Sequence, residues 1–123
     1  MSLQCTSAWI TLATPLFETL VQFYSQLLNA SPHPYLPNAY AEFQIAGLRI
    51  GIFNPKSEHR AEFGDPAGAA MSLCFDVDNL DEAIAWVTDL GCSLPYEIST
   101  ASHGREVYAY DPAGNRLILH QSF

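Results

Sequence analysis

One order of predicted elements occurs twice in this chain of 123 residues, and this repeat limits the possible folds most. Each copy begins with an alternating strand, at residues 8–13 and 71–77, and further strands follow. In each copy an amphipathic helix is predicted directly after the first strand, at residues 14–28 and 79–90, because apolar residues recur there at helical spacing. Each helix must bury its apolar face on a sheet. The repeat therefore predicts an α+β fold in which a curved mixed sheet carries both helices on one face.

The other predicted strands differ between the copies. The first copy has strands at Tyr40–Ile45 and Leu48–Phe53, joined by the two-residue turn at 46–47, and a short edge strand near Tyr35. In the second copy, residues 92–98 form a plausible strand. Thr14 can cap the first helix, whose apolar stripe is predicted to begin at Leu16.

The last predicted element is a hairpin at residues 104–121, with the turn Asp-Pro-Ala-Gly-Asn at 111–115. Proline presets the turn and glycine supplies its left-handed residue, so Asp111 should lie opposite Asn115. Counting outward gives two faces of alternating side chains. The predicted core face carries Val107, Ala109, Leu117 and Leu119. The other face carries Glu106, Tyr108, Tyr110, Arg116, Ile118 and His120.

Length and charge narrow the function classes. The chain has the size of a single domain, with a first module at about 4–54, a linker at 55–69 and a second module at about 70–122. Five Lys and Arg against thirteen Asp and Glu give a net charge of −8, which argues against nucleic acid and membrane as partners. No stretch has the length of a membrane helix and the N-terminus lacks a signal-peptide pattern, so a cytoplasmic location is expected. Three cysteines argue against a disulfide scaffold.

The second copy also carries a family likeness. The run Leu-Cys-Phe-Asp-Val-Asp-Asn-Leu-Asp-Glu-Ala at 73–83, then Leu90-Gly91, Gly104-Arg105 and the turn at 111–115 occur in sequence. This order resembles the vicinal oxygen chelate superfamily, which includes glyoxalase I, bleomycin and fosfomycin resistance proteins and extradiol dioxygenases. The resemblance implies two βαβββ modules and a homodimer.

The resemblance also implies where a metal ion would bind. Metal-dependent members place a His, Gln or Glu in the first strand and a Glu in the last strand of each module. The matching positions here are Trp9, Gly51, Ser72 and Ile118. None is a good ligand for a divalent ion, since such ions need several N or O donors. We therefore expect no metal and no other cofactor.

The face of the sheet away from the helices is rich in aromatic and acidic residues. Aromatic rings attract planar molecules and cations, and a carboxylate beside them adds attraction where water is excluded. The predicted function is metal-independent binding that sequesters a small aromatic or cationic ligand, as in bleomycin resistance proteins. The predicted ligand-binding residues are Trp9, Glu42, Phe53, Ser72, Asp76, Glu106, Tyr108, Tyr110, Arg116 and His120.

Three alternatives remain open at this stage. In one, His120 and Glu106 hold a relocated metal ion in a lyase or dioxygenase, with Asp76 or Glu42 as a third donor. In another, Glu106 or His120 is the base of a metal-free enzyme. In the last, the protein is a regulatory or structural dimer with a vestigial pocket. Tyr110–Arg116 and Gln44–Arg49 would then be ordinary cross-strand pairs, or a second subunit would bury part of this face.

Overall fold

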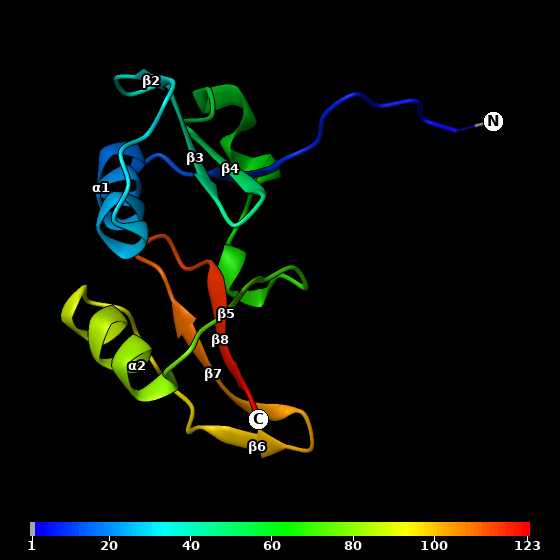
Figure 1. Ribbon diagram of the computed structural model, residues 1–123. Coiled ribbons are helices and arrows are strands. Elements are labelled where there is room, and N and C mark those ends of the chain that lie inside the picture. Colours follow the sequence, from blue (N-terminus) through cyan, green and yellow to red (C-terminus); the bar gives the residue numbers. More distant parts are fainter. Residues whose placement is uncertain (1) are drawn as a thin grey trace. The chain divides into compact units, whose positions relative to one another are not determined.

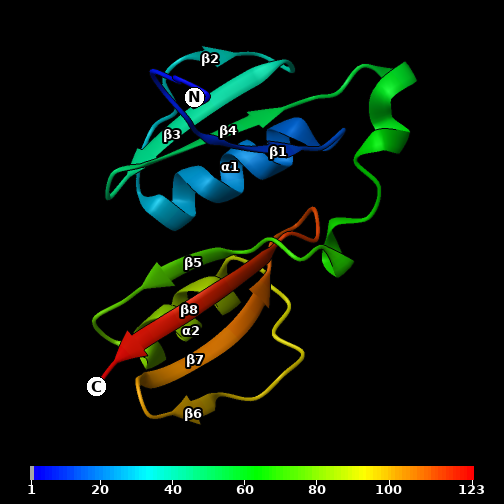
Figure 2. The ribbon, with the colours of Figure 1, turned by 90° about the vertical axis from the view of Figure 1, so that its right-hand side faces the viewer.

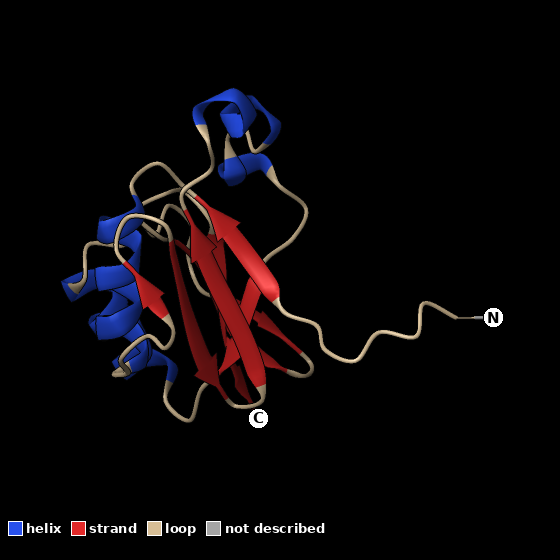
Figure 3. Ribbon diagram, turned by 90° about the horizontal axis from the view of Figure 1, so that it is seen from above, coloured by secondary structure: helices blue, strands red, loops and turns tan. Residues whose placement is uncertain are grey.

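A computed structural model describes residues 2–123 of the chain, and two compact units divide between Ala61 and Glu62. In each unit the order is strand, helix, then three strands (Figure 1). One face of each four-stranded sheet is covered by the helix of the same unit (Figures 2 and 3). The α+β class and the two βαβββ modules are thus confirmed, with the strands hydrogen-bonded as two mixed sheets.

The first unit has the strand order β1-β4-β3-β2, and β1 runs parallel to β4. Its β-hairpin has the predicted register, with Ile45 opposite Leu48, and the predicted edge strand near Tyr35 is present. The elements are β1 (Ile10–Ala13), α1 (Phe17–Leu28), β2 (Tyr35–Leu36), β3 (Tyr40–Ile45) and β4 (Leu48–Phe53).

Helix α1 starts later than predicted. The hydroxyl of buried Thr14 accepts a hydrogen bond from the backbone N–H of Leu16 at 2.9 Å, in the turn before the helix and not as its cap. Because the helix begins at Phe17, the apolar stripe starts there: Phe17 is 1% exposed, whereas Leu16 is 54% exposed. The prediction that placed Leu16 on the buried face was wrong. The stripe continues through Leu20 and Tyr24, both fully buried.

The second unit has the strand order β5-β8-β7-β6 and the predicted register of its last hairpin. All four residues of the predicted core face, Val107, Ala109, Leu117 and Leu119, are buried. Asn79 caps α2, since its side chain accepts a hydrogen bond from the N–H of Glu82 at 3.0 Å. The elements are β5 (Leu73–Asp76), α2 (Leu80–Asp89), β6 (Ser99–Ala101), β7 (Gly104–Tyr110) and β8 (Arg116–Ser122).

The strand predicted at residues 92–98 was also wrong. In this segment only Ser93 forms a β-bridge, opposite Tyr110, and the first strand after α2 is β6. Pro95 has no N–H to donate to a neighbouring strand, which interrupts pairing. The segment is therefore a loop, and this places Tyr96 at the edge of the site described below.

The region predicted as a linker contains two 3-10 helices, η1 (Ser57–Glu62) and η2 (Pro66–Gly68). Among residues 2–123, none of the helices is both long enough and apolar enough to cross a membrane.

Candidate functional site

The predicted ligand-binding residues divide between the two units. Trp9, Glu42 and Phe53 belong to the first unit, and the other seven belong to the second. Phe53 ends β4, where it is half-buried opposite Tyr40. We describe each group within its own unit.

In the first unit, Glu42 is engaged by its neighbours. Arg49 donates to both carboxylate oxygens, from Nη2 to Oε1 at 3.0 Å and from Nε to Oε2 at 3.2 Å. The Tyr40 hydroxyl donates to Oε1 at 2.9 Å. These hydrogen bonds, with that of Arg49 the stronger, hold the pKa of the Glu42 carboxyl below its ordinary value. The guanidinium also lies 4.6 Å from the centre of the Trp9 ring and donates to Ser7 at 2.6 Å.

This arrangement changes what the first unit can bind. A carboxylate that already holds a bidentate guanidinium offers little attraction to a second cation. The predicted role of Glu42 in binding a cationic ligand therefore has no support in the geometry of this unit.

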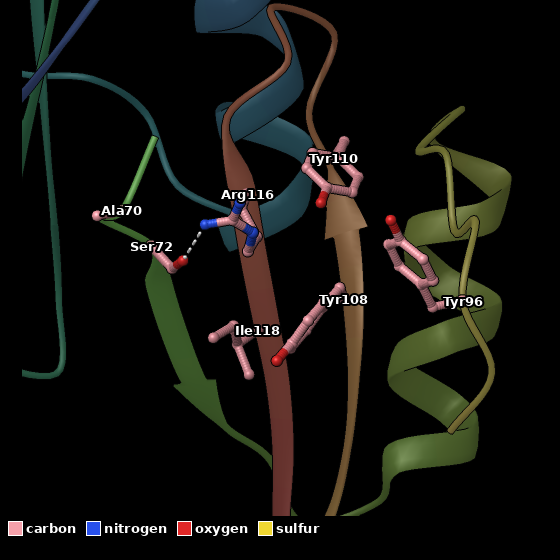
Figure 4. Close-up of a pocket in the computed structure, with 7 residues that line it drawn as sticks. All are labelled: Ala70, Ser72, Tyr96, Tyr108, Tyr110, Arg116 and Ile118. Atoms are coloured by element: carbon pink, nitrogen blue, oxygen red, sulfur yellow. Dashed lines mark hydrogen bonds between the residues drawn. The ribbon is translucent and has the colours of Figure 1, made fainter. Parts of the chain in front are cut away.

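In the second unit, four predicted residues line one hollow of about 420 Å³ (Figure 4). We call it the tyrosine hollow. Three of its residues, Ala70, Tyr96 and Ile118, were not predicted as ligand contacts, although Ile118 was predicted to lie on the same face as Tyr108 and Tyr110. Tyr96 lies in the loop after α2 and its ring meets that of Tyr108 edge-to-face, with 6.2 Å between ring centres. The lining consists of Ala70, Ser72, Tyr96, Tyr108, Tyr110, Arg116 and Ile118.

Arg116 forms part of the wall of the tyrosine hollow. Its Nη1 donates to the carbonyl of Ala69 at 2.7 Å and to the hydroxyl of Ser72 at 3.1 Å. The guanidinium carbon lies 5.9 Å from the centre of the Tyr110 ring, its register partner on β7. These contacts tie the start of β8 to the residues that precede β5, so the wall is held from two strands.

The other predicted residues of the second unit do not line this hollow. His120 Nδ1 lies 3.0 Å from Asp76 Oδ1, and His120 Nε2 lies 3.1 Å from Nδ1 of His103. Glu106 is the cross-strand partner of His120, as predicted from the hairpin register. The contact with His103 was not predicted, because His103 precedes the strand and its direction cannot be counted from the pleat.

The four positions that the family resemblance assigns to metal ligands do not fit a divalent ion. The ring of Trp9 is in cation–π contact with the Arg49 guanidinium, and the hydroxyl of Ser72 accepts a hydrogen bond from Arg116. At Gly51, an added Cβ would lie 2.7 Å from the Tyr40 hydroxyl, so the tyrosine occupies that space. Ile118 has no donor atom. Among residues 2–123 there is also no group of three or more His, Cys, Asp or Glu side chains placed to hold a metal ion.

Comparisons with known proteins identify the family. Residues 6–119 match the model of the Glyoxalase/Bleomycin resistance protein/Dioxygenase superfamily, so the chain belongs to this superfamily. No curated protein matches the chain significantly.

Several solved structures have the same fold. One is a glyoxalase/bleomycin resistance protein/dioxygenase family enzyme from Burkholderia phytofirmans PsJN, with 17% identity over 94% of this chain and 97% of that one, and a TM-score of 0.79. Protein ATC0852 from Agrobacterium tumefaciens has 23% identity over 94% and 95%, with a TM-score of 0.76. The fosfomycin resistance protein FosX from Listeria monocytogenes has 22% identity over 97% and 94%, with a TM-score of 0.75.

Proposed function

We propose that this superfamily member binds and sequesters a small aromatic molecule, neutral or cationic, in the tyrosine hollow, without the help of a metal ion. The observation that carries the proposal is the convergence of three tyrosine rings, Tyr96, Tyr108 and Tyr110, on one hollow. Its volume of about 420 Å³ lies within the usual range for small-molecule sites, roughly 300–1,000 Å³.

The tyrosine rings suit an aromatic ligand in shape and in electrostatics. Tyr96 and Tyr108 are 62% and 37% exposed, so each has ring surface that a ligand can bury. Aromatic pairs gain about 0.5–1.5 kcal/mol beyond the burial of their area. The phenol hydroxyls and the Ser72 hydroxyl supply a few polar contacts that can orient the bound ring.

The charge distribution favours neutral or cationic ligands over anions. Residues 62–123 contain ten Asp and Glu against two Arg, a net charge of −8, whereas residues 1–61 contain three acids and three bases. The whole acidic excess therefore lies in the unit that contains the tyrosine hollow. A field of this kind attracts cations and weakens as salt screens it. Because Arg116 lies beside Tyr110, we expect a ligand cation on the side of Tyr96 and Tyr108.

Three indoles of different charge test this proposal by isothermal titration calorimetry: indole, tryptamine and indole-3-acetate. We expect tryptamine to bind more tightly than indole-3-acetate, with a difference that shrinks at high salt, and we expect no effect of a chelator. Tyr108→Leu should weaken binding at least 10-fold, while Tyr108→Phe should keep most of it. Tyr35→Leu, which removes a comparably exposed tyrosine from the first unit, is the matched control.

Two results would overturn the proposal. One is the absence of binding by all three indoles at millimolar concentration. The other is an equal effect of Tyr108→Leu and Tyr35→Leu, which would place the bound ligand outside the tyrosine hollow. The expected homodimer, the cytoplasmic location and the ligand contacts of Trp9 and Phe53 remain predictions.

A further inference from the structure

A second group of chemically active side chains lies outside the tyrosine hollow, at the ends of β5, β7 and β8. Asp76, His120 and His103 form a continuous chain of contacts, with 3.0 Å between Asp76 and His120 and 3.1 Å between the two imidazoles. Asp76 and His120 lie opposite each other on the paired strands β5 and β8, and His103 lies in the turn just before β7, whose Gly104 pairs with Ser122 of β8. Strand pairing therefore fixes the backbone beneath this group.

The contact with Asp76 determines which nitrogen of His120 is available. A carboxylate only accepts hydrogen bonds, so Nδ1 of His120 carries the hydrogen that Asp76 receives. The lone pair of neutral His120 then lies on Nε2, which faces Nδ1 of His103. A carboxylate that orients an imidazole in this way is the usual outer partner of a metal-binding histidine.

The separation of the two facing nitrogens is suitable for chelation. Two imidazole nitrogens that bind one zinc ion at about 2.0–2.1 Å with tetrahedral geometry lie roughly 3.3 Å apart. Nδ1 of His103 and Nε2 of His120 are 3.1 Å apart, so both could bind one ion after a small movement. With the lone pair of His120 on Nε2, the hydrogen between the two rings belongs to Nδ1 of His103, and metal binding would require His103 to carry its hydrogen on Nε2 instead.

The backbone and the neighbouring charges also favour an ion here. Gly104, next to His103, has a φ of +152°, and a Cβ added to it would lie 2.9 Å from Nε2 of His120. A side chain at this position would displace the imidazole of His120. Burial raises the pKa of Cys74, and the nearby charges of Glu106 and Asp76 raise it further, so both carboxylates act on this part of the sheet.

We propose that Nδ1 of His103 and Nε2 of His120 chelate a divalent transition metal ion such as Zn²⁺, Ni²⁺ or Cu²⁺, with Asp76 as a positioning residue. Two protein ligands leave coordination positions for water or a small molecule. This site is distinct from the four positions of the family resemblance, since His120 follows Ile118 by two residues. It also differs from the relocated site predicted from sequence, because the second ligand is His103 in place of Glu106.

Titration of the metal-free protein with Zn²⁺ and with Co²⁺ tests the proposal, using calorimetry for stoichiometry and the visible absorption of Co²⁺ for coordination. We expect one ion per chain and at least a 10-fold loss of affinity in His103→Ala. Asp76→Asn should weaken binding roughly 10- to 100-fold, the usual effect of removing such an outer partner. His59→Ala, in the 3-10 helix η1, is the matched control and should bind as the unaltered protein does.

Nuclear magnetic resonance of the ring nitrogens supplies a second readout that does not need His120 to be replaced. Zn²⁺ should shift Nδ1 of His103 and Nε2 of His120 together, and Nδ1 of His120 should keep its hydrogen. Absence of binding at millimolar Zn²⁺, or unchanged affinity in His103→Ala, would overturn the inference. Absence of indole binding by the unaltered protein, with intact Zn²⁺ binding, would instead overturn the proposed function, so the two results are separable.

Discussion

Alanine at Gly104 should destabilise the second unit far more than the same change at Gly51 destabilises the first. Both glycines lie in strands, and both have a neighbour close to the place of an added Cβ. At Gly104 the Cβ would overlap the backbone carbonyl oxygen of Gln121, and φ is +152°. At Gly51 the nearest atom is the hydroxyl of Tyr40, 2.7 Å away at the far end of a side chain.

The magnitudes follow from which neighbour must move. A side chain at a φ that L residues rarely adopt costs about 1–3 kcal/mol, and forcing atoms into an occupied space costs about 1–3 kcal/mol more. Gly104→Ala should therefore lower the free energy of unfolding by roughly 3 kcal/mol. At Gly51, loss of the hydrogen bond from Tyr40 to Glu42 costs about 0.5–1.5 kcal/mol, and the lower entropy of the unfolded chain returns about 0.4–1 kcal/mol. The net change at Gly51 is close to zero.

Thermal unfolding followed by circular dichroism measures both variants. A chain of this length loses about 3–6 °C of melting temperature per kcal/mol, so Gly104→Ala should melt about 10 °C or more below Gly51→Ala. Gly104→Ala should also weaken Zn²⁺ binding, because it displaces His120. A melting temperature of Gly104→Ala within about 2 °C of the unaltered protein would refute the close approach of β7 to β8 at this point.

Three further measurements each test one local feature. Because Arg49 lowers the pKa of Glu42, their ion pair stabilises fully above the ordinary value of 4.5 and is lost as pH falls through the lowered pKa. The melting temperatures of Glu42→Gln and the unaltered protein should therefore converge below pH 4.5; a constant difference would contradict this. Burial raises the pKa of Cys92 to about 11, so at pH 8 only about 0.1% of this thiol is thiolate. Iodoacetamide should therefore alkylate exposed Cys5 before Cys92, as followed by mass spectrometry, and equal rates would contradict this. The Asp111 carboxylate accepts three hydrogen bonds from its turn, so Asp111→Ala should cost about 2–4 kcal/mol in urea unfolding, and a loss below 1 kcal/mol would argue against this network.

The last hairpin was the part of the fold best predicted from sequence. Its turn fixes the register, since the backbone N–H of Asp111 pairs with the carbonyl of Asn115, and every pair beyond follows by counting. The start of α1 was missed for the opposite reason. Leu16 and Phe17 are both apolar neighbours, so the helical period allows either to begin the stripe, and only the hydrogen bond to Thr14 decides between them.

The site was predicted less completely than the fold. Alternation along β7 and β8 placed Tyr108, Tyr110 and Arg116 on one face, and the tyrosine hollow uses all three. Tyr96 was missed because it lies in a loop, where no period gives the direction of a side chain. Glu42 was on the predicted face, but the sequence could not show that its charge is paired with that of Arg49.

The ion pair of Glu42 with Arg49 depends on the length of the arginine side chain. Arg49 lies opposite Gln44 in the register, as predicted, yet its guanidinium reaches the diagonal position and binds Glu42. Diagonal neighbours across a β-sheet are within reach of long side chains, so register alone does not fix which pair forms. Arg116 does not reach a diagonal partner in this way. Its guanidinium donates to Ser72, just before β5, and lies over the ring of its direct register partner Tyr110.

The two units therefore have the same fold but differ in what their sheet faces can do. In the first, the Glu42 carboxylate and the Trp9 indole are both engaged by Arg49, which lies between them. In the second, three tyrosines surround a hollow and two histidines face each other nearby, within the half of the chain that holds the whole net charge of −8. In a protein with two such modules, the side chains on one sheet face can bond to one another instead of to a ligand. The fold is kept, because the core residues lie on the opposite side of each strand. Binding by this protein is accordingly expected in the second unit, and substitutions at Glu42 should change stability and leave indole affinity unaltered.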